Sequence, residues 1–224
     1  MMSMSCITAA MVGIYTKMMP GEFIITAIPL NVINALIVTN ILHPVKIAEE
    51  EDTVARVNDG GKEREPFFSF LGNSILGAGR LILIICANVI AFVALAKLID
   101  MLMMLVHPDL TLENILGCIM FPFAWLMGLD TGEAFKLAQY MGTKLVTNEF
   151  VVMLNVQDIM GEFSRHMQGV LTVFVTSFAN FSTLGMIIGC FKGLVDDSKN
   201  ELISRNVGYM LLSGILVSLL SAGI

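Results

Sequence analysis

A carboxylate and a carboxamide stand side by side in a stretch of the chain that is otherwise largely apolar. Glu149 follows Asn148 within residues 143–153, which read TKLVTNEFVVM. An ionised carboxylate only accepts hydrogen bonds and can accept two hydroxyl donors at once, as a vicinal diol would offer. A buried carboxylate can also exchange a proton in the physiological pH range. Glu149 is therefore a candidate for binding a polyhydroxylated ligand and for carrying a proton.

A buried ion pair is the alternative interpretation of Glu149. Lys136 and Lys144 precede it in the same segment. Lys144 stands five positions away, whereas residues that pair on a helix surface stand three or four apart. Charged side chains inside membrane segments are rare and mark substrate, ion or proton pathways, which favours a ligand-binding role.

A second polar cluster lies at 176–185, with the sequence TSFANFSTLG. Its polar side chains do not fall on one stripe of a straight helix, which predicts a break in the helix near Asn180. The side-chain amides of Asn148 and Asn180 offer both donors and acceptors, which suits a sugar or the edge of a base. The ring of Phe178 supplies a flat apolar face beside them.

Enzyme motifs are absent from the sequence. It contains no G-x-S-x-G, no H-E-x-x-H and no glycine-rich phosphate loop. The four cysteines stand singly in apolar surroundings, which argues against a metal site or a disulfide framework. We expect no catalysis and no cofactor, and the net charge of -6 argues against a nucleic-acid partner.

The composition places these residues in a membrane protein. The chain is 56% hydrophobic and 14% charged, with a mean hydropathy of +0.79, whereas soluble domains carry about 25% charged residues. A bilayer core about 30 Å thick requires about 20 apolar residues per helix, and several such runs occur. We predict an all-α integral membrane protein, multi-pass and in contact with lipid, in the inner (plasma) membrane.

The apolar runs divide the chain into six segments. In order, these are two membrane helices at 1–42, a cytoplasmic loop and interfacial segment at 43–76, a long helix at 77–106, a hairpin at 111–155, a broken helix at 168–190, and a C-terminal membrane helix at 205–223. The hairpin consists of two short, interrupted apolar pieces, which predicts a re-entrant structure. Asp130 and Thr131 would form its tip, where Asp130 would cap the returning helix.

The distribution of Lys and Arg supports this topology. If the hairpin returns to its own side of the membrane, the loops 43–66 and 191–205 share one face. That face then carries seven basic residues against two on the other, namely Lys46, Arg56, Lys62, Arg64, Lys192, Lys199 and Arg205 against Lys17 and Arg165. The positive-inside rule makes the first face cytoplasmic.

Two segments resemble a known family. ILGCIMFPFAWLMGLDTGEAFKLAQYMGTKLVTNEFVVML, followed by TSFANFSTLGMIIG, is similar to the C-terminal half of the concentrative nucleoside transporters, and N-E-F-V and F-A-N-F-S are its most specific pieces. VTNILHPVKI and MVGIY are most similar to bacterial permeases thought to be proton-coupled. The resemblance implies nucleoside symport with a cation by a homotrimer. Each protomer would have a scaffold, including 77–106, and a moving transport domain with two hairpins and two broken helices.

The resemblance also implies roles for individual residues. The Glu of N-E-F, here Glu149, would bind the ribose, together with Phe178 and Asn180 of F-A-N-F-S. Thr183 stands where the family has a second Ser and keeps its hydroxyl. Met11 corresponds to a small apolar residue that packs near the base on the preceding broken helix.

Two departures from the family pattern affect the function. The sodium-coupled members use a Ser-Ile pair where this chain has Cys6 and Ile7, and a thiol is a poor ligand for a hard cation. This favours protons, with Glu149 as the proton carrier. The base-reading first hairpin of the family, with its G-Q-T-E-like tip, has no counterpart here, so no purine or pyrimidine preference is predicted. The alternative function is a non-transporting membrane gate, scaffold or assembly partner, or an inactive fragment.

Overall fold

The computed structural model describes residues 5, 9–44, 66–108, 110–192 and 197–224. All regular elements in these ranges are helices. They are α1 (Ala9–Tyr15), α2 (Gly21–Leu42), α3 (Phe67–Met104), α4 (Leu112–Leu126), α5 (Thr131–Val146), α6 (Glu149–Val156), the 3₁₀ helix η1 (Met160–Glu162), α7 (Arg165–Val175), α8 (Phe181–Lys192) and α9 (Asp197–Ala222). The predicted all-α class is confirmed.

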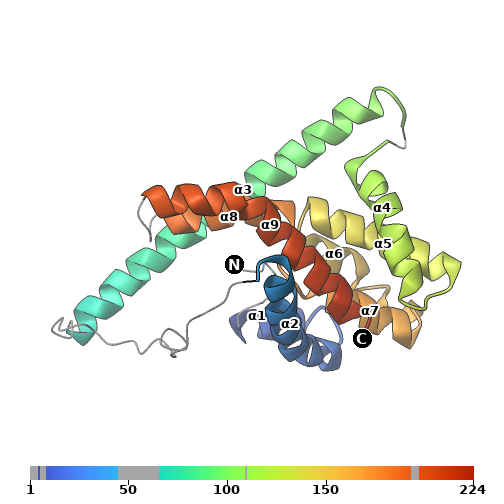
Figure 1. Ribbon diagram of the computed structural model, residues 1–224, viewed down its shortest axis with the longest axis horizontal. Helices are drawn as coiled ribbons and strands as arrows, with labels where there is room; N and C mark the ends of the chain where they lie inside the picture. The colour runs from blue at the N-terminus through green and yellow to red at the C-terminus, as the bar shows by residue number, and fades with distance from the viewer. Residues whose placement is uncertain (1–4, 6–8, 45–65, 109, 193–196) are drawn as a thin grey trace.

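The helices form a packed group from which one long helix projects (Figure 1). In the packed group, α2 and α7 both lie against α9, and α5 contacts α6 and α7. Its hydrophobic core is formed by side chains of α1, α2 and α4 to α7, among them Leu137, Met153 and Phe174. The long α3 contacts α8 and the start of α4, and its large apolar side chains, such as Phe68 at 82% exposure, are uncovered.

α4 and α5 form a helical hairpin within the range predicted for one, but the returning piece ends at Val146 and continues as α6 after a turn at Thr147 and Asn148. Gly128 has a φ of +84°, a left-handed conformation that favours glycine, at the turn between them. Asp130 then caps α5, its Oδ1 accepting a hydrogen bond of 2.7 Å from the Glu133 amide, as predicted. The two helices approach so closely that a Cβ on Gly142 would lie 2.5 Å from the Glu113 carbonyl oxygen.

The predicted break near Asn180 is also present. α7 ends at Val175 and α8 begins at Phe181, so that the residues between them form a non-helical connection. Thr172 and Thr176, on either side of the end of α7, are both fully buried. The break therefore lies inside the packed group, close to the hairpin.

Two helix boundaries differ from the sequence prediction. α3 begins at Phe67, so the segment expected to be a separate interfacial piece is the first part of one continuous helix. α9 begins at Asp197 and not at 205, and its polar first part includes an exposed ion pair of 2.6 Å between Arg205 and Glu201, four positions apart on the helix. Most of the expected loop at 43–66 falls outside the described residues.

Candidate functional site

Glu149 is the first residue of α6. The preceding helix α5 ends at Val146, and the chain turns through Thr147 and Asn148 before α6 begins. Asn148 is the N-cap of α6, where its Oδ1 accepts a hydrogen bond of 3.0 Å from the Val151 amide. A carboxylate at the start of a helix interacts favourably with the helix dipole, so the first turn of α6 is a suitable position for Glu149.

The carboxylate of Glu149 is buried and accepts a hydrogen bond on each oxygen. The side chain is 3% exposed. The Tyr15 hydroxyl of α1 donates to Oε1 at 3.0 Å, and the Asn180 amide, in the break between α7 and α8, donates to Oε2 at 3.0 Å. Three distant parts of the chain therefore meet at one carboxylate.

Asn180 organises the start of α8. Its Oδ1 accepts hydrogen bonds from the Ser182 hydroxyl at 2.6 Å and from the Thr183 amide at 2.9 Å. The Thr183 hydroxyl lies within hydrogen-bond distance of Asn180 Oδ1 at 2.8 Å and of the Phe178 carbonyl at 2.9 Å. These contacts fix the amide of Asn180 so that its Nδ2 is directed at Glu149.

The structure brings most of the sequence-predicted residues together. Glu149, Asn180 and Thr183 form one hydrogen-bonded chain, and the half-buried Phe178 adjoins it through its carbonyl group. Asn148 caps the helix that begins with Glu149. Met11 packs, partly buried, against the hydrophobic core. The predicted cation positions Cys6 and Ile7 lie outside the described residues.

Sequence reasoning missed two residues of this region. Tyr15 is fully buried and donates to Glu149, and the signal was that a buried tyrosine hydroxyl usually has a hydrogen-bond partner. Lys144 is also fully buried. Its Nζ donates to the Phe174 carbonyl and to the Ser177 hydroxyl. A direct ion pair with Glu149, the alternative interpretation that the spacing disfavoured, is not among the contacts of Lys144.

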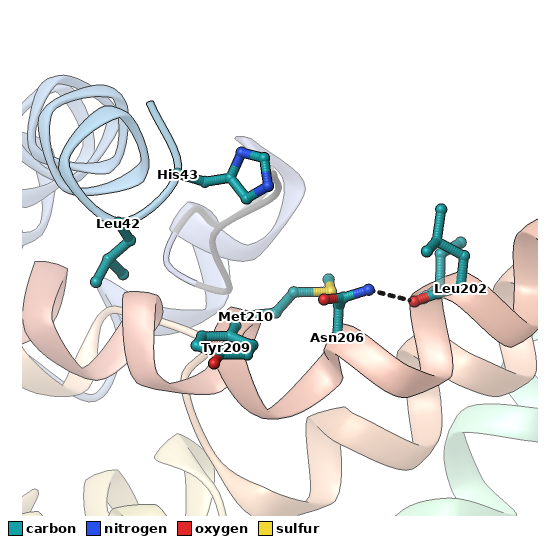
Figure 2. A pocket seen from close by; sticks show the side chains of 7 residues that line it. Leu42, His43, Leu202, Asn206, Tyr209 and Met210 are labelled. Carbon is teal, nitrogen blue, oxygen red and sulfur yellow. Dashed lines mark hydrogen bonds between the residues drawn. The ribbon is translucent and has the colours of Figure 1, made fainter. Parts of the chain in front are cut away.

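Two pockets in the described part of the chain lie elsewhere. One of about 540 Å³ lies between the end of α2 and α9 (Figure 2), lined by Leu42, His43, Leu202, Ile203, Asn206, Tyr209 and Met210. Its Asn206 amide donates to the Leu202 carbonyl of the same helix at 2.8 Å. The other, of about 330 Å³, lies among α2, α7 and the end of α9. Neither is lined by Glu149, whose carboxylate is covered in this structure.

The fold and the family comparison identify the class of protein. In the described residues, three helical stretches are long and apolar enough to cross a membrane, namely Gly21–Leu42, Phe67–Ile84 and Asn200–Ala222. The chain is an integral membrane protein. A family model described as "Na+ dependent nucleoside transporter C-terminus" matches residues 23–224. The chain belongs to this family, whose members are transporters and not enzymes, in agreement with the resemblance to concentrative nucleoside transporters.

Individual relatives support this assignment. The "Purine nucleoside transport protein NupG" of Bacillus subtilis (strain 168) is 43% identical over 224 residues, which are 100% of this chain and 56% of that protein. The "Nucleoside permease NupC" of Helicobacter pylori is 26% identical over 99% of this chain and 54% of its own length. The chain spans about half the length of these two relatives.

A solved structure has the same fold. The structure of CNTnw in an inward-facing substrate-bound state matches 98% of this chain and 54% of that chain, with a TM-score of 0.77 and 23% sequence identity. A variant of the same protein in an outward-facing state matches with a TM-score of 0.79 and 21% identity. At these identities the likeness shows the arrangement of the helices.

Proposed function

We propose that this chain is the C-terminal part of a transporter that moves nucleosides across the cytoplasmic membrane by symport with a cation. Membership of the nucleoside transporter family supports the substrate class. The single observation that carries the assignment to residues is the buried carboxylate of Glu149, which faces Tyr15 and Asn180 inside the packed helices.

The carboxylate has the capacity to bind a ribose diol. Its two oxygens together offer about four lone-pair positions for hydrogen bonds. Tyr15 and Asn180 each occupy one acceptor position, so a ligand hydroxyl would use a remaining position or replace one of these donors. The two hydroxyls of a ribose are vicinal, so they suit two acceptors that belong to the same carboxylate. A ligand of this kind replaces the hydrogen bonds that Glu149 loses on burial.

The neighbouring residues would complete the nucleoside site. Asn180 and Thr183 supply polar groups within the same hydrogen-bonded chain. The half-buried Phe178 supplies an aromatic ring beside them. Asn148 holds Glu149 at the start of α6. Met11 would pack near the base. Because the two oxygens of Glu149 are already covered in this structure, binding requires α1 or the break to move apart from α6.

The coupling cation in this proposal is the proton. The sequence places a thiol at Cys6, and sodium prefers oxygen ligands, although the description of the family names Na+. Glu149 would carry the proton. The protomers would associate as a homotrimer, with the hairpin and the broken helix moving against a scaffold that includes α3. The uncovered apolar surface of α3 supports contact with lipid or with other parts of such an assembly.

An uptake experiment tests the proposal. The whole transporter of which we propose this chain to be the C-terminal part is reconstituted in vesicles, and entry of radiolabelled uridine and adenosine is driven by an inward proton gradient or by an inward sodium gradient. We expect uptake with the proton gradient, its loss in Glu149→Gln, and normal uptake in Glu162→Gln, a matched change at an exposed carboxylate. Unchanged proton-driven uptake in Glu149→Gln would show that Glu149 has neither role. Uptake driven by sodium alone would contradict proton coupling.

One observation favours a second candidate function. Glu149 is 3% exposed and both of its oxygens already accept hydrogen bonds within the protein, which is also what a purely structural carboxylate would show. A membrane scaffold or gate that has kept the fold without transport would have this geometry. In the same vesicles, such a protein would take up neither nucleoside under either gradient.

A further inference from the structure

Lys144 is a fully buried cation that the proposed nucleoside site does not use. It lies in the last turn of α5 with 0% of its surface exposed. Its Nζ donates to the Ser177 hydroxyl at 2.9 Å and to the Phe174 carbonyl at 3.2 Å, and it lies 4.6 Å from the centre of the Phe174 ring. These partners are neutral, so none of them balances its charge.

The hydrogen bonds of Lys144 join three elements. Ser177 lies in the break between α7 and α8, and its hydroxyl is hydrogen-bonded to that of Ser218 in α9. Ser218 in turn donates to the Gly214 carbonyl of its own helix at 2.7 Å. Ser177 and Ser218 are both fully buried. One ammonium group therefore ties the hairpin to the break and, through the break, to the C-terminal helix.

Lys144 and Glu149 are buried charges of opposite sign that bond to the same break. Among the described residues, the buried charged side chains are Asp100, Lys144 and Glu149. Asp100 accepts from the Leu112 amide at the start of α4, whereas Lys144 donates to Ser177 and Glu149 accepts from Asn180, both in the break between α7 and α8. Removing a charge from water costs several kcal/mol per ion unless an opposite charge compensates it. Two opposite charges buried against one short segment therefore lower the cost of burying each other.

The pair is held apart in a way that matters for ligand binding. A lysine in direct contact with Glu149 would occupy the acceptor positions that a diol needs. Here the N–H groups of Lys144 donate to Phe174 and Ser177 instead. The N–H groups of Lys144 thus do not occupy the carboxylate oxygens, which accept hydrogen bonds from Tyr15 and Asn180.

We infer that Lys144 is a positioning residue of the nucleoside site, which balances the charge of Glu149 from a distance and fixes the break that presents Asn180. The nucleoside part of this inference rests on the proposed function. The charge balance between Lys144 and Glu149 does not, so the two can be tested separately.

The first experiment is a double-variant cycle on thermal stability of the full chain in detergent. We expect Lys144→Gln, which keeps hydrogen-bond donors but removes the charge, to lower the unfolding midpoint strongly. Adding Glu149→Gln should restore part of that loss, because the uncompensated carboxylate is then gone. Ser177→Ala serves as the control that removes a hydrogen bond and keeps both charges, and its defect should not be relieved by Glu149→Gln. Additive effects of the Lys144 and Glu149 changes would overturn the charge balance.

The second experiment covers the case in which Lys144→Gln does not fold. Lys144→Arg keeps the charge, and we expect the KM of this variant for nucleoside uptake to stay within a few-fold of the KM of the unchanged protein. Lys144→Gln, where folded, should raise the KM at least tenfold. A folded Lys144→Arg variant whose KM is raised as much as that of Lys144→Gln would overturn the positioning role. If the unchanged whole transporter takes up no nucleoside, the proposed function fails, while the stability cycle still decides the charge balance.

Discussion

Tyr15 and Asn180 share the carboxylate of Glu149, although Tyr15 stands 134 positions before it in the chain. The resemblance of N-E-F-V and F-A-N-F-S to family motifs allowed the partnership of Glu149 and Asn180 to be anticipated from the sequence. Nothing local marks Tyr15 as the other donor. A hydrogen bond to a charged group contributes about 1.5–3 kcal/mol, so its tyrosine hydroxyl is a substantial part of what keeps Glu149 oriented.

Replacing Tyr15 with phenylalanine tests this orientation. Tyr15→Phe keeps the ring, which packs edge-on against Phe150, and removes the donor to Glu149. We expect a destabilisation of about 1.5–3 kcal/mol, measured by thermal unfolding in detergent, and a several-fold weaker affinity for nucleoside. Tyr209→Phe, at a tyrosine that is 61% exposed on α9, is the matched control and should change neither quantity. Equal behaviour of the two variants would show that the Tyr15 hydroxyl is dispensable.

Sequence reasoning also failed at Lys144 for a physical reason. Its spacing from Glu149 excluded a contact on one helix surface, and this was correct. What the sequence does not contain is the tertiary position of Phe174 and Ser177, which accept from Lys144 across the packed helices. The partners of a buried charge such as Lys144 can be identified only when the packing of the helices is known.

At the scale of elements, the hairpin depends on two helices that nearly touch. Its tip was predictable because Gly128 and Asp130 are residues that turns and helix caps prefer, and the break near Asn180 was predictable from the scatter of polar side chains. The starts of α3 and α9 were not. Pro66 precedes a helix that continues through residues expected at the interface, and the polar residues of α9 were indistinguishable from a loop until Arg205 and Glu201 were seen to pair.

The close approach of α4 and α5 gives a prediction for Gly142. A Cβ there would lie 2.5 Å from the Glu113 carbonyl oxygen and 2.9 Å from the Gly117 nitrogen, both of which belong to the backbone of α4. Gly142→Ala should therefore separate the hairpin helices and destabilise the protein by about 1–3 kcal/mol, as measured by thermal unfolding. Gly208→Ala, in open space on α9, should be neutral or slightly stabilising. A Gly142→Ala variant as stable as the parent would contradict the packing of the hairpin.

At the scale of the whole molecule, the polar side chains of the site are buried, and the long α3 projects from the packed helices (Figure 1). The chain spans about half the length of the relatives it matches. Large apolar side chains on α3, including Leu83 and Ile90, are exposed, as expected for a surface that meets lipid or protein. Glu149 does not line either of the described pockets. The proposed ligand therefore binds at a carboxylate that is covered in this structure.

The most direct measurement is the nucleoside-dependent shift in the thermal unfolding of the purified transporter of which we propose this chain to be a part. Ligand at about 100 times its Kd stabilises a protein by about 2.7 kcal/mol, so a shift is expected with uridine or adenosine. The matched 2′,3′-dideoxynucleosides lack the diol proposed to bind Glu149, and they should give little or no shift, as should either nucleoside with Glu149→Gln. Equal stabilisation by a nucleoside and its dideoxy counterpart, or an undiminished shift in Glu149→Gln, would contradict the account.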